Sequence, residues 1–284
     1  MPKTIKPRTW FITGASTGFG RILAEEVLKA GGNVIATARK PEQVADLEQQ
    51  YPQSAKALAL DVTDASQVDS AVAQAFAQFG QIDVLVNNAG YGIAGAIEEA
   101  TEAEFRPVFE TNVFGLIRVT RAFLPYLRRQ RSGHILNLSS IGGVTASPGW
   151  GYYQSTKFAV EGISEALAAE LAPLGIHVTL IEPGPFRTDF LGRSGVVAAQ
   201  RIADYDATAG NARQYQSAQN GKQPGDPVRA VHAMMQVVDS PQPPLRLLLG
   251  AGALKRLRAK LDDWQQEIAA WESITVGADF PENQ

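Results

Sequence analysis

The feature of this sequence that most constrains its fold is a regular alternation between short apolar runs and longer segments of helical periodicity. The short runs have the length and β-branched content of strands, and they are Thr9–Thr13, Asn33–Ala38, Ala55–Leu60, Ile82–Val86, His134–Leu138, His177–Ile181 and Leu245–Leu249. Helical segments between them include Gly20–Ala30, Ala65–Phe79, Glu102–Arg129 and Tyr153–Leu171. Strands that alternate with helices form right-handed βαβ crossovers, which make the strands parallel. The alternation therefore predicts an α/β fold with a seven-stranded parallel sheet covered by helices on both faces.

The chain is long enough for one doubly wound domain of the Rossmann type, and no repeat or low-complexity linker divides its 284 residues. We therefore expect a single domain over residues 1–284. The stretch 189–227 breaks the alternation with weak periodicity and five glycines. Because a connection of this length is usually functional, we expect it to form a partly helical flap over a substrate.

A last helix is predicted over Leu254–Trp271, within a C-terminal extension over 251–273. Its apolar residues recur at alternating steps of three and four and form one stripe along the helix. Such a stripe predicts that the helix packs on its own domain or on a partner subunit. The same segment carries four basic residues, Lys255, Arg256, Arg258 and Lys260. These residues leave contact with a membrane surface as the alternative.

Composition excludes several classes of function. The chain has no cysteine, which rules out disulfides, thiolate nucleophiles and cysteine-ligated metals. No histidine and carboxylate cluster has metal-ligand spacing, so no metal site is predicted. A net charge of −3 does not indicate nucleic acid as a partner. Residues 1–7 lack the apolar segment of a secretory signal and no apolar run is long enough to span a membrane, so we expect a cytoplasmic protein.

A glycine-rich turn follows the first strand directly and opens the first helix. It reads Thr-Gly-Ala-Ser-Thr-Gly-Phe-Gly over residues 13–20. Glycines allow a tight turn, and the N–H groups at the positive end of a helix favour a pyrophosphate. The spacing G-x-x-x-G-x-G differs from the common dinucleotide fingerprint G-x-G-x-x-G. Because it lies between a strand and a helix, the turn still indicates a dinucleotide site, with the candidates Gly14, Ser16, Thr17, Gly18, Phe19 and Gly20.

The end of the second strand predicts which nicotinamide dinucleotide is preferred. Folds that choose NAD place an acidic residue there to accept from the ribose 2′-hydroxyl. This sequence reads Ala-Thr-Ala-Arg-Lys over residues 36–40, without a carboxylate. Arg39 can pair with a 2′-phosphate, although it could also be an ordinary solvated arginine. We therefore expect NADP(H) to be preferred, with NAD(H) possible, and we expect Asp61 and Val62 after the third strand to meet the adenine.

Tyr153 and Lys157 lie four residues apart at the start of a predicted helix, so their side chains share one face. An ammonium close to a phenol favours the phenolate and lowers its pKa from about 10 by about 1–3 units. Such a pair can serve as a general acid or base. Ser140 follows the fifth strand, whereas its neighbour Ser139 would point to the opposite face. Ligands bind at the carboxyl ends of strands in such sheets, which favours Ser140 as a partner of the pair.

Further candidate residues follow the ends of the other predicted strands. The fourth strand ends in Asn-Asn-Ala-Gly over residues 87–90, the sixth precedes Pro183, Gly184 and Thr188, and Asn112 interrupts a helical segment. This ordered set, over about residues 8–250, resembles the short-chain dehydrogenase/reductase family in its short single-domain branch. Within that branch the chain is similar to carbonyl reductases and to 17β-hydroxysteroid-dehydrogenase-like enzymes.

The resemblance implies an oxidoreductase that moves a hydride between the nicotinamide and a carbonyl or alcohol carbon. Tyr153 would exchange a proton with the substrate oxygen, and Ser140 would hydrogen-bond that oxygen. Lys157 would hold the nicotinamide ribose, and Asn112 would anchor a water that leads protons to solvent. The remaining cofactor contacts would come from Asn88, Ala89, Gly90, Pro183, Gly184 and Thr188. The resemblance also implies a homodimer or homotetramer that pairs the helices 102–129 and 153–171.

Two alternatives come from other classes of protein. Residues 14–18 also match G-x-S-x-G, a hydrolase nucleophile elbow, but too little chain precedes Ser16 to supply that fold's oxyanion donors. A catalytically silent NADP-binding regulator would be expected to lack Tyr153 or Lys157, and both are present. The substrate itself is predicted only as a ketone, aldehyde, lipid or steroid-like molecule. Its apolar pocket candidates are Tyr91, Ile93, Ile141, Val144, Trp150 and Phe186.

Overall fold

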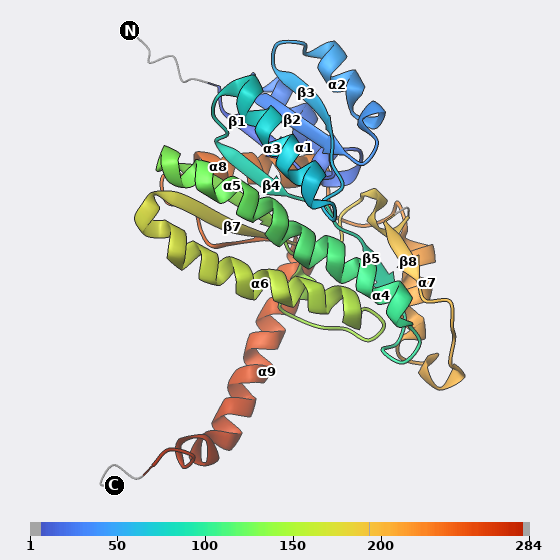
Figure 1. Ribbon diagram of the computed structural model, residues 1–284. Coiled ribbons are helices and arrows are strands. Elements are labelled where there is room, and N and C mark those ends of the chain that lie inside the picture. Colours follow the sequence, from blue (N-terminus) through green and yellow to red (C-terminus); the bar gives the residue numbers. More distant parts are fainter. Residues whose placement is uncertain (1–6, 193, 281–284) are drawn as a thin grey trace.

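A seven-stranded parallel sheet forms the centre of the protein (Figure 1). The computed structural model describes residues 7–192 and 194–280, so the predicted absence of a signal over 1–7 falls almost wholly outside the described residues. The strand order is β3-β2-β1-β4-β6-β7-β9, and every neighbouring pair is parallel. The strands are β1 (Thr9–Ile12), β2 (Asn33–Ala38), β3 (Ala55–Ala59), β4 (Val84–Asn87), β6 (Gly133–Leu138), β7 (Ile176–Pro183) and β9 (Arg246–Leu249).

Helices cover both faces of the sheet, because the strands carry apolar side chains on both sides. One face packs against α1 (Gly18–Lys29), α2 (Ala45–Gln50) and α8 (Pro227–Asp239). The other face packs against α3 (Ala65–Phe79), α5 (Leu116–Gln130) and α6 (Gly151–Leu171). Each face thus has its own hydrophobic core. The predicted doubly wound α/β fold is confirmed.

The helix predicted over 102–129 is interrupted in the structure. Its first part is α4 (Glu102–Phe109), which a π-helical turn over Glu110–Gly115 joins to α5. Asn112 lies in this turn and is buried. A π turn inserts an extra residue into the helical ladder and is common at functional sites. The low helix propensity of asparagine marked the position in the sequence, but not the kind of turn.

The stretch 189–227 is partly helical and lies over one end of the sheet strands, with position 193 outside the described residues. It contains β8 (Gly195–Val197) and α7 (Gly210–Gln219). β8 pairs in parallel with β5 (Gly92–Ala94), a short strand that follows β4. Neither short strand was predicted, because three residues are too few to show a period. The pairing nevertheless ties the flap to the chain that leaves the sheet.

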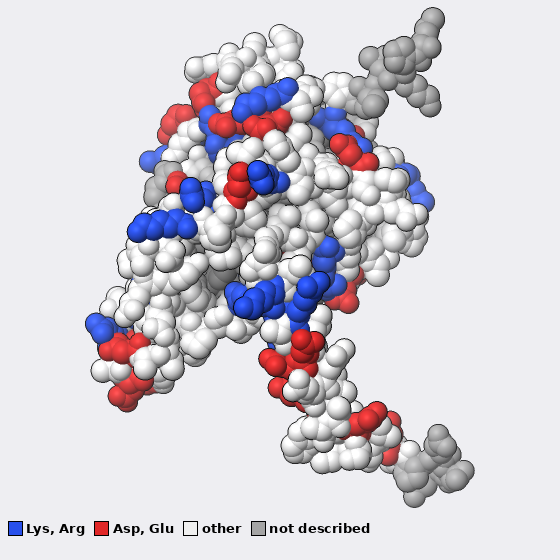
Figure 2. Space-filling view, turned by 180° about the vertical axis from the view of Figure 1, so that it is seen from behind, with Lys and Arg blue, Asp and Glu red and all other residues white. Residues whose placement is uncertain are grey.

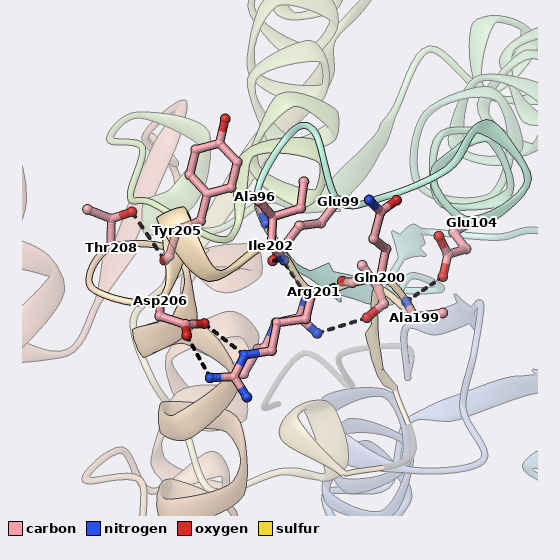
Figure 3. Close-up of polar contacts among 12 residues, drawn as sticks. Ala96, Glu99, Glu104, Ala199, Gln200, Arg201, Ile202, Tyr205, Asp206 and Thr208 are labelled. Atoms are coloured by element: carbon pink, nitrogen blue, oxygen red, sulfur yellow. Dashed lines mark hydrogen bonds and ion pairs between the residues drawn. The ribbon is translucent and has the colours of Figure 1, made fainter.

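A buried carboxylate fastens the flap (Figure 3). Glu99 accepts hydrogen bonds from the backbone N–H groups of Ala96, at 2.7 Å, and of Ile202, at 2.9 Å. Arg213 of α7 pairs with the same carboxylate at 2.7 Å, and the Glu99 side chain is only 3% exposed. A carboxylate that is buried with this many donors is costly to leave half-paired. Glu99 is therefore the point at which the flap is locked to the segment after β5.

The last helix, α9 (Ala251–Val276), begins after β9 and extends away from the body of the protein (Figure 1). Ala253 is its one buried residue within the described chain. Apolar side chains stay exposed further along, from Leu261 at 46% to Ile274 at 63%. The expectation that this helix packs on its own domain is therefore wrong beyond its first turns, because its path leaves the domain there.

We predict that Glu99→Ala destabilises the protein by about 3–5 kcal/mol, because it leaves Arg213 as a partly buried charge without its partner. Urea unfolding measures the change. Glu104→Ala is the matched control, since Glu104 also accepts from the flap, at the N–H of Ala199 (2.8 Å), but at the protein surface. The control should cost about 1 kcal/mol. Equal losses in both variants would contradict the role of Glu99.

Candidate active site

A large cleft, with a volume of about 1830 Å³, opens at the carboxyl ends of the sheet strands. Its walls are the segments that follow β1, β2, β3, β4, β6 and β7. The strand order reverses between β1 and β4, and in open α/β sheets ligands bind in the crevice at that point. The flap and the segment around the π-helical turn line the rest of the cleft.

The glycine turn forms the wall next to β1. Gly14 and Gly18 have positive φ angles of 65° and 57°, which residues with a Cβ adopt at a cost. Asn88 braces the turn, because its Nδ2 donates to the carbonyl oxygens of Thr13 and Gly14, each at 2.9 Å. At the start of α1, the N-cap residue Thr17 makes no side-chain capping bond, and the first turn has no acidic residue. The N–H groups and the positive end of α1 therefore face the cleft as an anion site.

Gly20 differs from the other predicted residues of the turn because it does not line the cleft. A Cβ on Gly20 would lie 2.5 Å from Nδ2 of Asn88 and 2.6 Å from the carbonyl oxygen of Gly14. The absence of a side chain thus allows the helix to pack tightly against the turn. We correct the predicted role of Gly20 from cofactor contact to packing of the turn.

The far end of the cleft contains the groups predicted for the adenosine. Arg39 follows β2, is exposed and lines the cleft. No acidic side chain in the described part of the chain forms an ion pair with it. Asp61 and Val62 line the same cleft after β3. The Oδ1 atom of Asp61 accepts from the backbone N–H and the hydroxyl of Thr63, at 2.9 and 2.7 Å, so its position is fixed.

Tyr153 lies in the first turn of α6 and lines the cleft together with Ser140. Ser140 is held in turn by the N–H of Gly142, which donates to its Oγ at 2.9 Å. The ring of Phe190, from the flap, lies 5.1 Å from the tyrosine ring. Burial of the hydroxyl raises the pKa of Tyr153 to about 12, and the nearby Ser140 side chain acts in the opposite direction. The phenol is therefore protonated at neutral pH, which is the form that donates a proton.

Lys157 lies one turn further along α6. Its Nζ donates to the carbonyl oxygen of Leu138 at 2.7 Å and lies 5.8 Å from the centre of the Tyr153 ring. Burial lowers the pKa of Lys157 to about 8, while the nearby charge of Glu161 acts to raise it. The prediction that the pKa of Tyr153 lies below its ordinary value is wrong for this structure, because desolvation is the largest effect on both groups.

Asn112 is 1% exposed and does not line the cleft. Its Oδ1 accepts from the N–H of Tyr91 at 3.0 Å, and its Nδ2 donates to the carbonyl oxygen of Tyr91 at 2.9 Å and to Oγ1 of Thr156 at 3.0 Å. Protein groups therefore use both amide hydrogens. These bonds make Asn112 a brace between the loop after β4 and α6, and its role as the anchor of a water stays a prediction.

The other predicted contacts are distributed unevenly. Those that line the cleft are Ser16, Phe19, Ala89, Gly90, Pro183, Gly184 and Thr188 from the cofactor set, and Tyr91, Ile141, Trp150 and Phe186 from the apolar set. Ile93 and Val144 do not line it. Ile93 is 2% exposed in a small separate core, because β5 turns its side chain away from the cleft. Phe190 was missed, since the irregular flap shows no period that would mark an inward residue.

Two polar residues of the cleft also escaped prediction. Gln223 is 1% exposed, and neither amide atom has a hydrogen-bond partner within the described chain. Arg256, from the base of α9, donates to Oγ1 of Thr145 at 2.7 Å and to Oγ of Ser147 at 3.0 Å. Arg256 therefore ties α9 to the loop that leads into α6. A local sequence pattern cannot predict contacts between residues that are more than a hundred positions apart.

No helix in the described ranges is both long and apolar enough to cross a membrane. Across residues 7–192 and 194–280, histidine, aspartate and glutamate side chains form no group of three that could hold a metal ion.

The cleft at the switch point of a doubly wound sheet, with a buried tyrosine and lysine beside a glycine turn, defines the class of protein as a nicotinamide-dependent oxidoreductase. The short chain dehydrogenase family matches the sequence over residues 8–195. The chain belongs to this family, the short-chain dehydrogenases/reductases, as its ordered motifs indicated.

Known relatives cover almost the whole chain. It is 42% identical to Oxidoreductase BOA17 of Botryotinia fuckeliana over 272 residues, which are 95% of this chain and 99% of that protein. The crystal structure of a short-chain dehydrogenase from Streptomyces avermitilis is similar with a TM-score of 0.90 at 43% identity. That match covers 97% of this chain and 100% of the other.

Solved structures of more distant neighbours contain both nicotinamide dinucleotides. A 3-ketoacyl-(acyl-carrier-protein) reductase from Brucella melitensis was complexed with NADH, with a TM-score of 0.73, 28% identity and 88% and 99% of the two chains covered. An alcohol dehydrogenase from Thermococcus sibiricus was complexed with 5-hydroxy-NADP, with a TM-score of 0.71, 26% identity and 86% and 96% covered. As a family member, the present chain is an NAD(P)-dependent dehydrogenase or reductase.

Proposed function

We propose that this protein uses NADP(H) to interconvert a ketone or aldehyde and the corresponding alcohol on a mostly apolar small molecule. The observation that carries the proposal is the position of Tyr153. Its protonated side chain lines the same cleft as Ser140, the glycine turn and Lys157. A proton donor beside a dinucleotide site is what carbonyl reduction requires.

In the direction of reduction, Tyr153 donates its proton to the carbonyl oxygen, which Ser140 holds by a hydrogen bond. NADPH supplies the hydride that forms the new bond to the carbonyl carbon. Proton and hydride together convert the carbonyl to an alcohol and leave Tyr153 as a phenolate. The ammonium of Lys157, 5.8 Å from the ring centre, then stabilises that negative charge. In the direction of oxidation the phenolate accepts the hydroxyl proton.

Arg39 supports the preference for NADP(H). It lines the cleft after β2, and the described chain supplies no carboxylate that would neutralise it. A planar guanidinium can bind a 2′-phosphate through two charge-assisted hydrogen bonds. No acidic residue at the end of β2 offers the acceptor that a ribose 2′-hydroxyl would use.

The substrate end of the cleft supports an apolar molecule with at least one polar group. Trp150 and Phe190 supply aromatic walls next to Tyr153, with their ring centres 6.4 Å apart and 6.2 and 5.1 Å from that of Tyr153. The amide of Gln223 is buried there without a partner, so it is available to hydrogen-bond a polar group of the substrate. Apolar walls with a few placed polar groups are typical of small-molecule sites.

We predict that Arg39→Asp weakens NADPH binding by about tenfold or more and leaves NADH binding unchanged or improved, because it replaces attraction to the 2′-phosphate by repulsion. Fluorescence titration with both dinucleotides measures the effect. Lys40→Asp is the matched control, since it makes the same change of charge one residue away from the cleft lining. An unaltered preference in the Arg39 variant would refute the assignment of NADP(H).

We predict that Tyr153→Phe lowers carbonyl reduction by about 10²–10⁴-fold, because it removes the proton donor. NADPH binding should stay close to that of the wild type. A panel of ketones and aldehydes, followed by loss of NADPH absorbance, measures turnover. Tyr152→Phe is the control, because the Tyr152 hydroxyl donates to the carbonyl oxygen of Ile97 at 3.1 Å and takes no part in the proposed step. Full activity without the Tyr153 hydroxyl would place proton transfer elsewhere.

We predict that kcat/KM for reduction is constant at low pH and falls as the pH rises through about 8. The reason is that burial lowers the pKa of Lys157, so its ammonium is lost there rather than near its ordinary value of 10.5. Tyr153 stays protonated through this range, because its pKa is raised. A pH profile of initial rates tests the prediction, and activity that held constant up to the ordinary lysine value would contradict it.

A further inference from the structure

The α9 helix leaves the body of the protein with its apolar side chains uncovered (Figure 1). Its base is fixed by Ala253, which lies against Gly184, and by the bonds from Arg256 to Thr145 and Ser147. Beyond that base, Trp264 is 55% and Trp271 is 62% exposed. A row of large apolar side chains in water is unfavourable, and most of the stability of a helix in a protein comes from packing of its apolar face.

The apolar residues of α9 have the spacing of a coiled coil rather than that of a helix on a globular core. Steps of three and four alternate through six of them, Leu254, Leu257, Leu261, Trp264, Ile268 and Trp271, whereas Ile274 and Val276 at the end of the helix lie outside this repeat. This repeat of 3.5 residues places them at the a and d positions of consecutive heptads. A helix on a globular core has a wider stripe that also takes in e or g positions. Here the flanking positions between 258 and 272 are polar, namely Arg258, Lys260, Gln265, Glu267 and Glu272.

The two halves of α9 carry opposite charge. The first half contains four basic residues, Lys255, Arg256, Arg258 and Lys260. The second half contains four acidic residues, Asp262, Asp263, Glu267 and Glu272. Figure 2 shows Lys and Arg side chains gathered at the base of this helix, with Asp and Glu further out along it. A second α9 that ran in the same direction would place like charges side by side, whereas one that ran in the opposite direction would place opposite charges together.

The antiparallel register that overlaps all six apolar residues is unique. It pairs Leu254 of one copy with Trp271 of the other, Leu257 with Ile268, and Leu261 with Trp264, each pair occurring twice by symmetry. In the same register the g positions Lys260 and Glu267 of the two copies face each other. A parallel pairing would instead set Glu267 opposite Glu272 of the other copy, which is repulsive.

We propose that α9 binds the α9 of a second copy of this chain as an antiparallel two-helix coiled coil. The proposal is independent of the catalytic function. It is also independent of any pairing of α5 and α6 between subunits. Exposed apolar residues are present there as well, since Phe114 just before α5 is 52% exposed and Phe158 in α6 is 46% exposed. If those faces also pair, the wild type is a tetramer; if they do not, it is a dimer.

Sedimentation of the full chain tests the proposal. Leu261→Glu places a charge in the centre of the apolar stripe, and the molar mass of the assembly should halve. Ala259→Glu is the matched control, because this exposed residue lies on the opposite side of the same helix and should leave the mass unchanged. NADPH titration shows that both variants are folded. A wild type with the same mass as the Leu261 variant would overturn the proposal.

Charge reversal tests the direction of the pairing. In the antiparallel arrangement, Lys260→Glu and Glu267→Lys should each weaken association by about three- to tenfold, and the double variant should restore it. In a parallel arrangement, Glu267→Lys alone would strengthen association, because it removes the repulsion from Glu272. Stronger association in that single variant therefore overturns the antiparallel assignment.

A membrane surface is the competing occupant of the stripe, and vesicles distinguish it from a second copy. The full chain is mixed with vesicles that contain phosphatidylserine, and its tryptophan fluorescence, which includes that of Trp264 and Trp271, is followed. The coiled coil buries both residues, so vesicles should leave the spectrum unchanged. A shift of the tryptophan emission when vesicles are added would show that these residues bind the membrane. That result would overturn the proposal.

Discussion

Parallel strand pairing is the constraint on which the site depends. Because all strands of the sheet run in one direction, the segments that leave their carboxyl ends emerge along one edge, and the cleft lies there. Gly14 and Tyr153, which are far apart in the sequence, thereby line the same cavity. The reversal of strand order between β1 and β4 then opens the crevice that a dinucleotide can enter. The flap, locked at Glu99, completes the enclosure.

Enclosure sets the chemistry of the two groups on α6. Desolvation penalises whichever form is charged, so the same environment raises the pKa of Tyr153 and lowers that of Lys157. In solution the amine of a lysine has a higher pKa than the phenol of a tyrosine. In this site the order is reversed, and Tyr153 has the higher pKa. A phenol that holds its proton firmly until a carbonyl oxygen is in place avoids a standing negative charge in an apolar cavity.

Local sequence patterns correctly predicted the features that depend on neighbouring residues, such as strands and tight turns. The run Asn33–Ala38 is β2 in the structure, and Gly14 and Gly18 of the glycine turn have the positive φ angles that favour glycine. Long-range contacts could not be predicted in this way. The pair Glu99–Arg213 and the bonds of Arg256 to Thr145 join segments more than a hundred residues apart. The sign of the Tyr153 pKa shift also failed, because a neighbouring charge is visible in a sequence and desolvation is not.

Arg256 connects the base of α9 to the region of the active site. Its bonds reach Thr145 and Ser147, and Ser147 is in turn bonded to Gln154, the neighbour of Tyr153. Through these hydrogen bonds the base of α9 is joined to the loop at the mouth of the cleft and to the residue next to Tyr153.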